Sequence, residues 1–548
     1  MIVISRTSNG PRIRLAAGTP APPGATLASF VLFAALACLL AMLYAFGEWF
    51  SAGGFGFPSD AAWTRLVFAQ NIASGKGLSF NPGVPVAGAA GPAWVALLGL
   101  GGLVLVSHVF AAKLLGVICL ILTAYLVWAI TLELLEDWRF AFLAAVATVA
   151  SPRLVPAALG GTEGALAALL LAAVLHWQAR SWRGGKGLRR AVAAFAGLAA
   201  LCRPELLLLL PLMLVDRGVT AAVKADPGRR LQTALRSGLP EVLGATLVLV
   251  PYLIYNWRVG GPLWQQPEAA LHAQPLLAWP KALLGQLWHS NPVLACAALV
   301  GLPVAVLAAA GEVSFHPSFL VGLIPLTVVV APGLLWPNAS LANATYAAAY
   351  LSPLTAILGS AGLFLIHRQA KALVLGWRNR VGRIVLAVGI VASVGALGLF
   401  AWLSHSAAWR QHGVAVKKVS GLQVYIGRWA FQHLAPDASI ASREVGAIGF
   451  YSRRRMVDLG GAIDSAGMEA LRRPGSPDTN LLAYLLLTKP SHLAIRPADF
   501  PDLSQRTDLF KPATTCMVTD PVSGGVATMV LYETPWPAPS LRALEHHQ

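Results

Sequence analysis

The chain has 548 residues, of which 56% are hydrophobic and 12% are charged. Average soluble chains carry roughly 25% charged residues, so this composition excludes a large soluble protein and predicts an integral membrane protein. The formal net charge is +17, but the basic residues cluster in short loops between apolar segments. That pattern sets membrane topology and argues against a nucleic-acid partner.

The N-terminal region is predicted to be a basic arm followed by a membrane anchor. Residues 1–24 carry three arginines and then a Pro/Ala/Gly stretch, so we expect a disordered basic arm. Residues 26–46 are about twenty apolar residues, which is too long for the core of a signal peptide. Because the basic flank stays in the cytoplasm, residues 47–91 are expected on the outer side of the membrane.

The stretch 57–94 combines an acid, a short apolar stripe and a Gly/Pro-rich loop. Asp60 opens it, and Trp63, Leu66 and Val67 recur at helical spacing. That spacing predicts either a helix lying in the membrane interface or an ordinary packed helix of a loop.

Counting charges along the rest of the chain predicts a multi-pass protein with its N-terminus inside and its C-terminus outside. Residues 91–110 are apolar but rich in glycine, and we expect them to be interfacial or re-entrant. Three basic loops then fall on the same inner side, which supports the topology. The predicted spans, about eleven, are 26–46, 113–132, 140–155, 165–178, 191–201, 206–215, 242–255, 292–309, 319–335, 346–366 and 384–403.

The character of the sequence changes in residues 404–548, where charged residues become frequent and short apolar runs alternate with turns. GLQVYIGRWAFQHL predicts an amphipathic helix. SIAS, RMVDL, HLAIR and VATMVLYE predict short strands. We therefore expect a polytopic α-helical membrane domain over residues 25–403, followed by a small extracytoplasmic α/β domain.

Two carboxylates could carry chemistry. Asp60 could act as a general base near its working pH if it is partly desolvated, or it could cap the helix that follows. Glu163, in GGTEG, begins a span on the same side of the membrane, where a helix N-terminus also favours an acid. The predicted topology places both acids on one membrane face, as a catalytic pair would require.

Arg203 and Glu205 interrupt an otherwise apolar run, LCRPELL. Charges inside membrane segments are costly and usually mark function or a buried pair. The guanidinium fork of Arg203 matches phosphate oxygens, although a local pair with Glu205 would also explain both residues. Further cations predicted on or near the same face, any of which could contact an anionic lipid or be solvated, are Arg65, Lys76, Arg153, Arg258 and Lys281.

No soluble nucleotide site is apparent. The sequence has no P-loop and no GxGxxG in a strand–helix context. The five cysteines have no spacing typical of a metal site or a disulfide framework. An activated donor, if one is used, is therefore expected to be lipid-linked.

Several of these motifs resemble the GT-C superfamily of integral membrane glycosyltransferases, which includes arabinofuranosyltransferase-like and 4-amino-arabinose/mannosyltransferase-like proteins. SDAAWTRLVFAQNIASGKGLSFNPG resembles their first outer loop, GGTEGALAALLL a Gly-Met-Glu-Thr element, LCRPELLLLLP an Arg-Pro-Glu element, and residues 426–464 the start of the outer C-terminal domain. Taken in order, these matches extend over most of the chain.

The resemblance implies transfer of a sugar from a polyprenyl-phosphate-linked donor to a glycan, lipid or protein acceptor at the outer face of the cytoplasmic membrane. It implies that Asp60 is the catalytic base, that Glu163 is a second acid, and that Arg203 matches an arginine of unassigned role. From the predicted topology, Arg65, Lys76, Glu205, Arg258 and Lys281 are further candidates for binding the substrate or the lipid phosphate.

The sequence also departs from the family pattern. Ser59 stands where the family usually has the first aspartate of a pair, and NPGVPVAGAAGP replaces acidic and aromatic residues. These departures leave open a divergent acceptor, a divalent cation as cofactor, or lost activity. A lipid-linked saccharide transporter and a catalytically degenerate assembly partner are the alternatives to an enzyme, although a transporter predicts a repeat between halves and none is evident.

Overall fold

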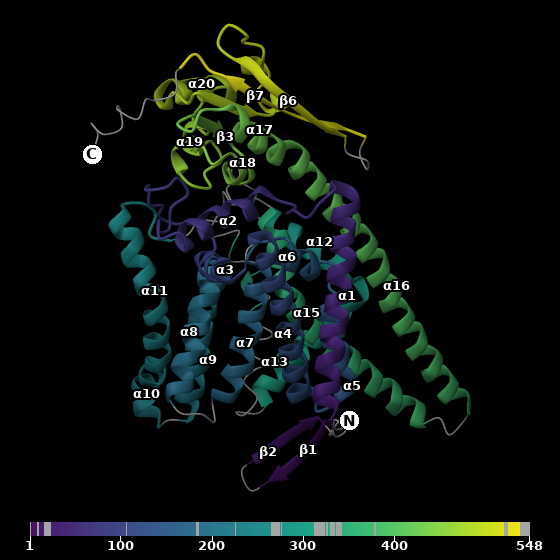
Figure 1. The fold of residues 1–548 in the computed structure, drawn as a ribbon. Coiled ribbons are helices and arrows are strands. Elements are labelled where there is room, and N and C mark those ends of the chain that lie inside the picture. Colours follow the sequence, from purple (N-terminus) through teal and green to yellow (C-terminus); the bar gives the residue numbers. More distant parts are fainter. Residues whose placement is uncertain are drawn as a thin grey trace.

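The structure is a computed structural model, mostly helical, with a bundle of long helices that carries an α/β domain at one end (Figure 1). The α/β domain lies on α2, and a two-stranded hairpin lies at the opposite end of the bundle. The described residues are 2–7, 10–15, 24–105, 107–181, 186–224, 226–264, 275, 277–311, 324, 327–328, 332, 335, 342–376, 380–519 and 524–536.

The bundle end that carries the α/β domain is called the domain-side end below. The elements that precede the domain are β1 (Ile2–Thr7), β2 (Gly10–Leu15), α1 (Ala25–Ala52), α2 (Asp60–Ala73), α3 (Pro92–Val104), α4 (His108–Leu135), α5 (Trp138–Val149), α6 (Leu154–Leu159), α7 (Gly164–Ser181), α8 (Lys186–Cys202), η1 (Pro204–Leu208), α9 (Leu209–Lys224), η2 (Pro227–Arg229), α10 (Arg230–Ser237), α11 (Leu239–Val259), α12 (Ala278–Ser290), α13 (Pro292–Gly311), α15 (Ala342–Gly376) and α16 (Arg380–Val419).

The bundle is that of a membrane protein. Within the described residues, five helical segments are long and apolar enough to cross a bilayer, and four shorter apolar helices accompany them. The total of about eleven spans stays a prediction, because most of the expected span 319–335 lies outside the described residues. The five segments are Thr26–Ala52, His108–Leu135, Arg230–Val259, Asn343–Ala372 and Ala387–His433.

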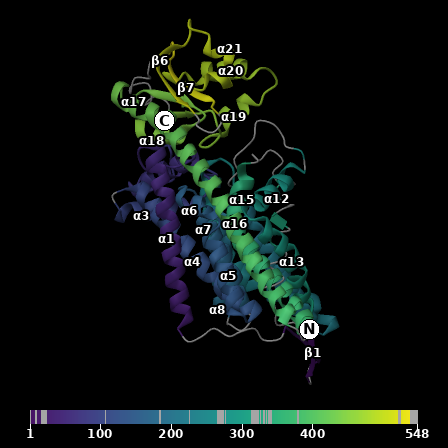
Figure 2. The ribbon, with the colours of Figure 1, turned by 90° about the vertical axis from the view of Figure 1, so that its right-hand side faces the viewer.

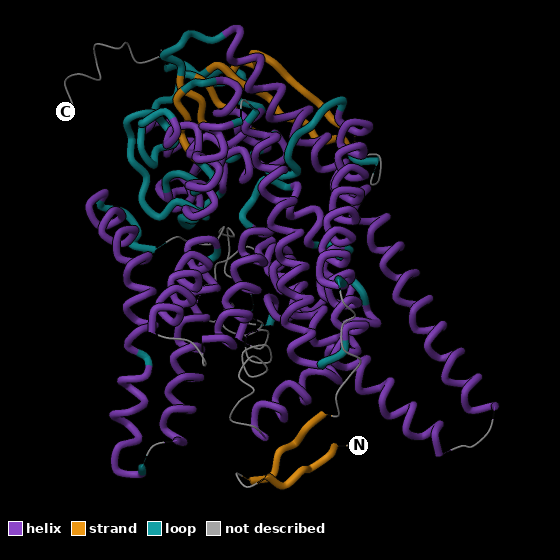
Figure 3. Tube along the Cα trace, turned by 60° about the horizontal axis from the view of Figure 1, so that its bottom comes forward, coloured by secondary structure: helices purple, strands orange, loops and turns teal. Residues whose placement is uncertain are grey.

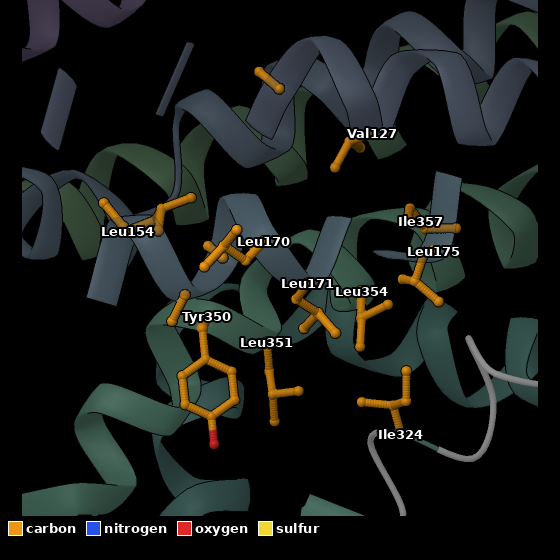
Figure 4. Close-up of a cluster of buried hydrophobic side chains, with 14 of the residues drawn as sticks. Val127, Leu154, Leu170, Leu171, Leu175, Ile324, Tyr350, Leu351, Leu354 and Ile357 are labelled. Carbon is orange, nitrogen blue, oxygen red and sulfur yellow. The ribbon is translucent and has the colours of Figure 1, made fainter. Parts of the chain in front are cut away.

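The core of the bundle is packed largely with alanine and leucine from α4, α6, α7 and α15. Figure 4 shows one part of it, where leucines of α6, α7 and α15 gather beside Val127 of α4. Close approach of α13 and α15 depends on small residues. A Cβ added at Gly301 would lie 2.0 Å from the carbonyl oxygen of Leu358, and one at Gly362 would lie 1.9 Å from that of Ala297. Small residues of this kind let membrane helices pack backbone to backbone.

The structure shows how the two predicted segments before α4, which form α2 and α3, are folded. α2 is a packed helix, since Trp63 is 1% exposed and Leu66 is fully buried, so the interfacial alternative is wrong. α3 has 13 residues, whereas a membrane span needs roughly 20. Its length of about 20 Å is also less than the roughly 30 Å of the hydrocarbon core. This length agrees with the expectation that 91–110 does not cross the membrane.

Other boundaries differ from the predictions. The N-terminal arm, expected to be disordered, forms the antiparallel pair β1–β2 over its described residues, consistent with the strand preference of its β-branched residues. The expected span 140–155 divides into α5 and α6, and the expected loop 256–290 contains α12. The domain boundary at residue 404 is wrong because α16 continues to Val419 and runs along the bundle into the α/β domain (Figure 2).

The α/β domain contains the predicted strands and one that the sequence did not reveal. Its strands gather at one end of the molecule (Figure 3) and form one sheet in the order β4-β3-β5-β7-β6. β4, β3 and β5 are parallel to one another, and β7 runs antiparallel to both of its neighbours, β5 and β6. The strand missed was β6, whose sequence KPATTCMVT lacks a continuous apolar face. The elements of the α/β domain are η3, a π-helical turn (Ser420–Val424), α17 (Tyr425–His433), β3 (Ser439–Ser442), α18 (Val445–Ser452), β4 (Arg455–Asp458), α19 (Ser465–Leu471), α20 (Pro477–Thr488), β5 (His492–Ile495), η4 (Pro497–Asp499), α21 (Pro501–Ser504), β6 (Lys511–Thr519) and β7 (Val526–Glu533).

Candidate active site

A cavity of about 1860 Å³ lies between the domain-side end of the helix bundle and the α/β domain. Its walls come from α2, the Gly/Pro-rich loop after it, the turns that precede α7 and η1, the start of α15, and the loops around β3, β4 and α19. Asp60, Arg65, Glu163 and Arg203 all line it. The structure therefore brings together the four residues that the sequence placed on one membrane face.

Asp60 is the first residue of α2, and its carboxylate caps a different helix. Its Oδ2 accepts the backbone N–H of Gly446 at 2.7 Å, and its Oδ1 accepts that of Ala447 at 2.8 Å. Both donors belong to the first turn of α18, where backbone N–H groups lack helical partners and favour an anion. A single side chain thus joins the loop after the first membrane helix to the α/β domain.

The contact between α2 and α18 requires glycine at position 446. A Cβ added there would lie 2.2 Å from the carbonyl oxygen of Asp60 and 2.6 Å from the backbone nitrogen of Thr64. The two helix starts touch through their backbones, so the position of the Asp60 carboxylate is fixed by main-chain packing.

Burial of its carboxylate raises the pKa of Asp60 to about 7. The N–H groups of Ala447 and Gly446 oppose this rise, while the nearby carboxylates of Glu444 and Asp458 add to it. A carboxylate with a pKa close to the working pH is suited to general-base catalysis.

Glu163 is buried between two arginines. The Arg65 Nε lies 2.5 Å from Glu163 Oε2 and its Nη2 lies 3.0 Å from Oε1, while the Arg203 Nη1 lies 3.1 Å from the same Oε1. Glu163 is 1% exposed. Both of its oxygens are engaged by guanidinium groups, which is an arrangement for orienting cations rather than for accepting a substrate proton.

Arg203 is the most connected of these side chains. Its Nη2 donates to Glu205 Oε1 and to Asn343 Oδ1, each at 3.0 Å, and its guanidinium lies 5.2 Å from the centre of the Tyr346 ring. The helix α8 ends directly before it, and Pro204 starts η1, so the predicted turn is present. The predicted pair of Arg203 with Glu205 is present. Arg203 also lines the cavity, and its binding of a phosphate stays a prediction.

The loop after α2 is held by two asparagines. Asn71 Nδ2 donates to the carbonyl oxygens of Ser79 and Phe80 at 2.8 and 2.9 Å. Asn81, of the Asn-Pro-Gly motif, donates to the Met456 carbonyl and accepts the Met456 N–H, both at 2.9 Å. Asn81 therefore pairs with β4 as a neighbouring strand residue would, and it seals this side of the cavity.

The α/β domain adds charged residues that the sequence analysis did not propose. Asp458, at the end of β4, accepts four backbone N–H groups from residues 460–464, and burial raises its pKa. Arg443, Arg455 and Arg496 line the same wall of the cavity. The only sequence signal was their place within the stretch 426–464 or, for Arg496, at the end of a predicted strand.

Some predicted residues lie elsewhere. In the part of the chain that the structure describes, Lys76 follows α2, Arg258 lies in the last turn of α11, and Lys281 lies in α12; all three are exposed and none lines the cavity. Arg153 precedes α6, also outside the cavity. Lys76, Arg258 and Lys281 therefore lie apart from the other candidates, and their contact with a lipid phosphate stays a prediction.

The described residues contain no group of three or more His, Cys, Asp or Glu side chains placed to hold a metal ion. Asp458 and Asp464 both line the cavity, but each accepts backbone N–H groups. The charge of this site is set mainly by arginines facing carboxylates.

Comparison with solved structures identifies the fold. ArnT from Cupriavidus metallidurans, bound to undecaprenyl phosphate, matches with a TM-score of 0.57 and 16% identity over 91% of this chain and 97% of that one. The oligosaccharyltransferase of Archaeoglobus fulgidus matches with a TM-score of 0.60 and 13% identity over 94% of this chain and 75% of that one. That archaeal protein, AglB, matches equally in complex with an inhibitory peptide and a dolichol-phosphate.

The chain therefore has the GT-C fold, and the resemblance seen in its motifs is confirmed at the level of the fold. Residues 412–532 also match the model of a family described as a domain of unknown function, DUF8728. This match starts within α16 and extends over the α/β domain. No curated protein matches the sequence.

Proposed function

We propose that the protein is a membrane glycosyltransferase. It moves a sugar from a polyprenyl-phosphate-linked donor to a glycan, lipid or protein acceptor at the outer face of the cytoplasmic membrane. The single observation that carries this proposal is the cavity at the domain-side end of the bundle, in which a carboxylate of pKa about 7 and a pair of buried arginines occur together. The GT-C fold supports it.

The proposed reaction is a direct displacement at the anomeric carbon. An acceptor hydroxyl oxygen forms the new bond to that carbon, the bond from the carbon to the donor phosphate oxygen breaks, and the electron pair leaves with the polyprenyl phosphate. Asp60 takes the proton of the acceptor hydroxyl. Each Asp60 oxygen accepts one backbone N–H, and a carboxylate oxygen retains a further lone pair for this proton.

In this proposal Arg65 and Arg203 stabilise the negative charge that develops on the departing phosphate. Guanidinium groups bind phosphate oxygens through two parallel hydrogen bonds. Glu163 is a positioning residue, because it holds both guanidinium groups within 3.1 Å of its carboxylate. It also offsets the cost of burying two cations at the boundary of the membrane.

One observation favours a second candidate, a non-catalytic assembly partner that binds a lipid-linked saccharide. Both oxygens of Asp60 already accept hydrogen bonds from α18, so the carboxylate could serve as a permanent latch between α2 and the α/β domain. This reading predicts that the cavity binds a polyprenyl-phosphate sugar without turnover.

Mass spectrometry of the cell envelope tests the proposal. Envelope glycans and lipid-linked sugars are compared in cells with the gene, without it, and with the gene restored. We expect loss of one glycosylated product and accumulation of one polyprenyl-phosphate sugar in the deleted strain. Unchanged glycans and unchanged lipid-linked sugars would contradict a transferase. Adding a chelator to membranes that carry the protein tests the dependence on a divalent cation in the same assay.

A further inference from the structure

A second cavity of about 370 Å³, which Asp60 does not line, lies where the end of α1 meets the junction of α16 and the π-helical turn η3. Residues from seven elements converge on it, and we call it the junction cavity. Its volume is at the small end of the range for ligand sites. Its lining residues are Ser51, Ala52, Gly53, Gly54, Phe55, Trp63, Lys417, Ser420, Gly421, Val424, Arg428, Tyr451 and Val518.

The lining of the junction cavity is cationic. Lys417 and Arg428 line it, and no carboxylate does. Lys417 forms no ion pair within the described residues, and Arg428 lies over the ring of Tyr451 at 5.0 Å. Lys417 does not pair with unsatisfied carbonyl groups at a helix C-terminus, because α16 continues without a break into η3 and α17. Two cations with no lining anion define a site for a negatively charged ligand.

Trp63 supplies an independent indication. Its indole Nε1–H is buried and has no hydrogen-bond partner among the described residues, and the residue is 1% exposed. A buried donor without an acceptor is costly. Ser420 also lines the cavity, so a ligand rich in acceptors could take hydrogen bonds from Trp63 and Ser420 while it neutralises the two cations.

The junction cavity adjoins a group of exposed aromatic side chains at the domain-side end of α1. Trp49, Phe50 and Phe55 are 56%, 78% and 57% exposed, and the rings of Trp49 and Phe55 lie 5.7 Å apart. Phe55 itself lines the cavity. Aromatic residues are enriched at the level of the lipid headgroups, so this opening faces the place where phospholipid headgroups lie.

We propose that the junction cavity binds the phosphate of an anionic phospholipid headgroup. Lys417 and Arg428 pair with the phosphate oxygens, Trp63 and Ser420 donate hydrogen bonds to it, and the exposed aromatic residues contact the lipid next to the cavity. The site lies apart from the candidate active site, so the proposal does not depend on glycosyl transfer. In this proposal the lipid phosphate accepts the hydrogen bond of the buried Trp63 indole N–H, which has no partner among the described residues.

Native mass spectrometry of the purified full-length protein, titrated with dioleoylphosphatidylglycerol, tests this proposal. We expect one tightly retained lipid, with affinity lowered about tenfold or more in the double variant Lys417→Gln/Arg428→Gln, since charge-assisted hydrogen bonds to phosphate are strong. The double variant Lys418→Gln/Arg410→Gln removes the same charge from exposed positions outside the cavity and should leave the affinity unchanged.

Further arms identify the ligand. Trp63→Phe keeps a ring but removes the N–H, and we expect it to weaken lipid binding about threefold to tenfold. Dioleoylphosphatidylcholine and glycerol 3-phosphate should bind at least tenfold more weakly than the anionic lipid. Equal affinity in the two double variants would overturn the site, and glycerol 3-phosphate binding as tightly as the lipid would overturn the lipid headgroup as its ligand. Elution as a single species on gel filtration confirms that each variant is folded.

Discussion

Replacing Asp60 by asparagine separates the two roles that the structure allows this side chain. The substitution keeps the size of the side chain but removes the proton acceptor. It also turns one of the two oxygens that accept N–H groups from Gly446 and Ala447 into a donor. One of the two bonds to α18 is therefore lost, and a donor then faces a donor.

The expected magnitudes differ enough to decide between the roles. Loss of a general base lowers the rate about 10²- to 10⁴-fold. Loss of one buried hydrogen bond costs about 1–3 kcal/mol, which weakens the attachment of the α/β domain but leaves it attached. The hydrogen bond is lost in either role, so a base predicts near-complete loss of transfer in a protein that stays folded. An Asp60 that only holds α18 in place predicts a modest loss of stability and no comparable fall in transfer.

The pH dependence gives a second reading of the same variant. Because the pKa of Asp60 is raised to about 7 and a general base must be deprotonated, transfer should rise with pH through about 7. It should fall towards about a tenth of its maximum at about pH 6. The residual rate of Asp60→Asn should be independent of pH across this window.

Membranes from a strain that lacks the gene supply both donor and acceptor for the assay. Purified protein is added, and product formation is followed by mass spectrometry between about pH 5.5 and 8.5. Asp478→Asn is the matched control, because Asp478 also accepts a backbone N–H, from Leu503 at 2.6 Å, but does not line the cavity. If Asp60→Asn transfers sugar at the wild-type rate with the wild-type pH profile, Asp60 is not the base.

Two further substitutions test the packing around the site. Gly446→Ala places a Cβ 2.2 Å from the Asp60 carbonyl oxygen, and such overpacking costs about 1–3 kcal/mol of stability. The weakened contact should be detected as faster proteolysis between the bundle and the α/β domain. An unchanged cleavage rate would contradict the close contact. Glu163→Gln leaves Arg65 and Arg203 buried beside a neutral amide, which costs about 3–5 kcal/mol. Its apparent melting temperature should fall, and adding Arg65→Met should recover part of the loss.

Local sequence signals predicted much of the fold. Long apolar runs marked α1, α4, α11, α13 and α15, and short apolar runs between turns marked β3, β4, β5 and β7. The charged interruption at Arg203 marked both a turn and a residue that lines the cavity. These predictions succeeded because each rests on neighbouring residues, whose spacing fixes which side chains share a face.

The contacts that build the cavity could not be predicted in this way. The Asp60 carboxylate meets Ala447 across 387 positions, and Asn81 meets Met456 across 375. No local pattern encodes such pairings, because they depend on how α16 returns the chain to α2. The arginines of the α/β domain were missed for the same reason, since a charged residue beside a strand is most often solvated.

Asp60 and Glu163, the two carboxylates that the sequence predicted, also show why residue type alone did not assign their roles. Glu163 has two guanidinium partners within 3.1 Å, which stabilise its negative form and hold it in place. Asp60 has only backbone donors, and the carboxylates of Glu444 and Asp458 oppose its ionisation, so its pKa rises to about 7. Environments that separate two acids in this way favour one proton-transfer group and one fixed charge. The donors and both opposing carboxylates belong to the α/β domain, so removing that domain should change the protonation of Asp60 as well as the shape of the cavity.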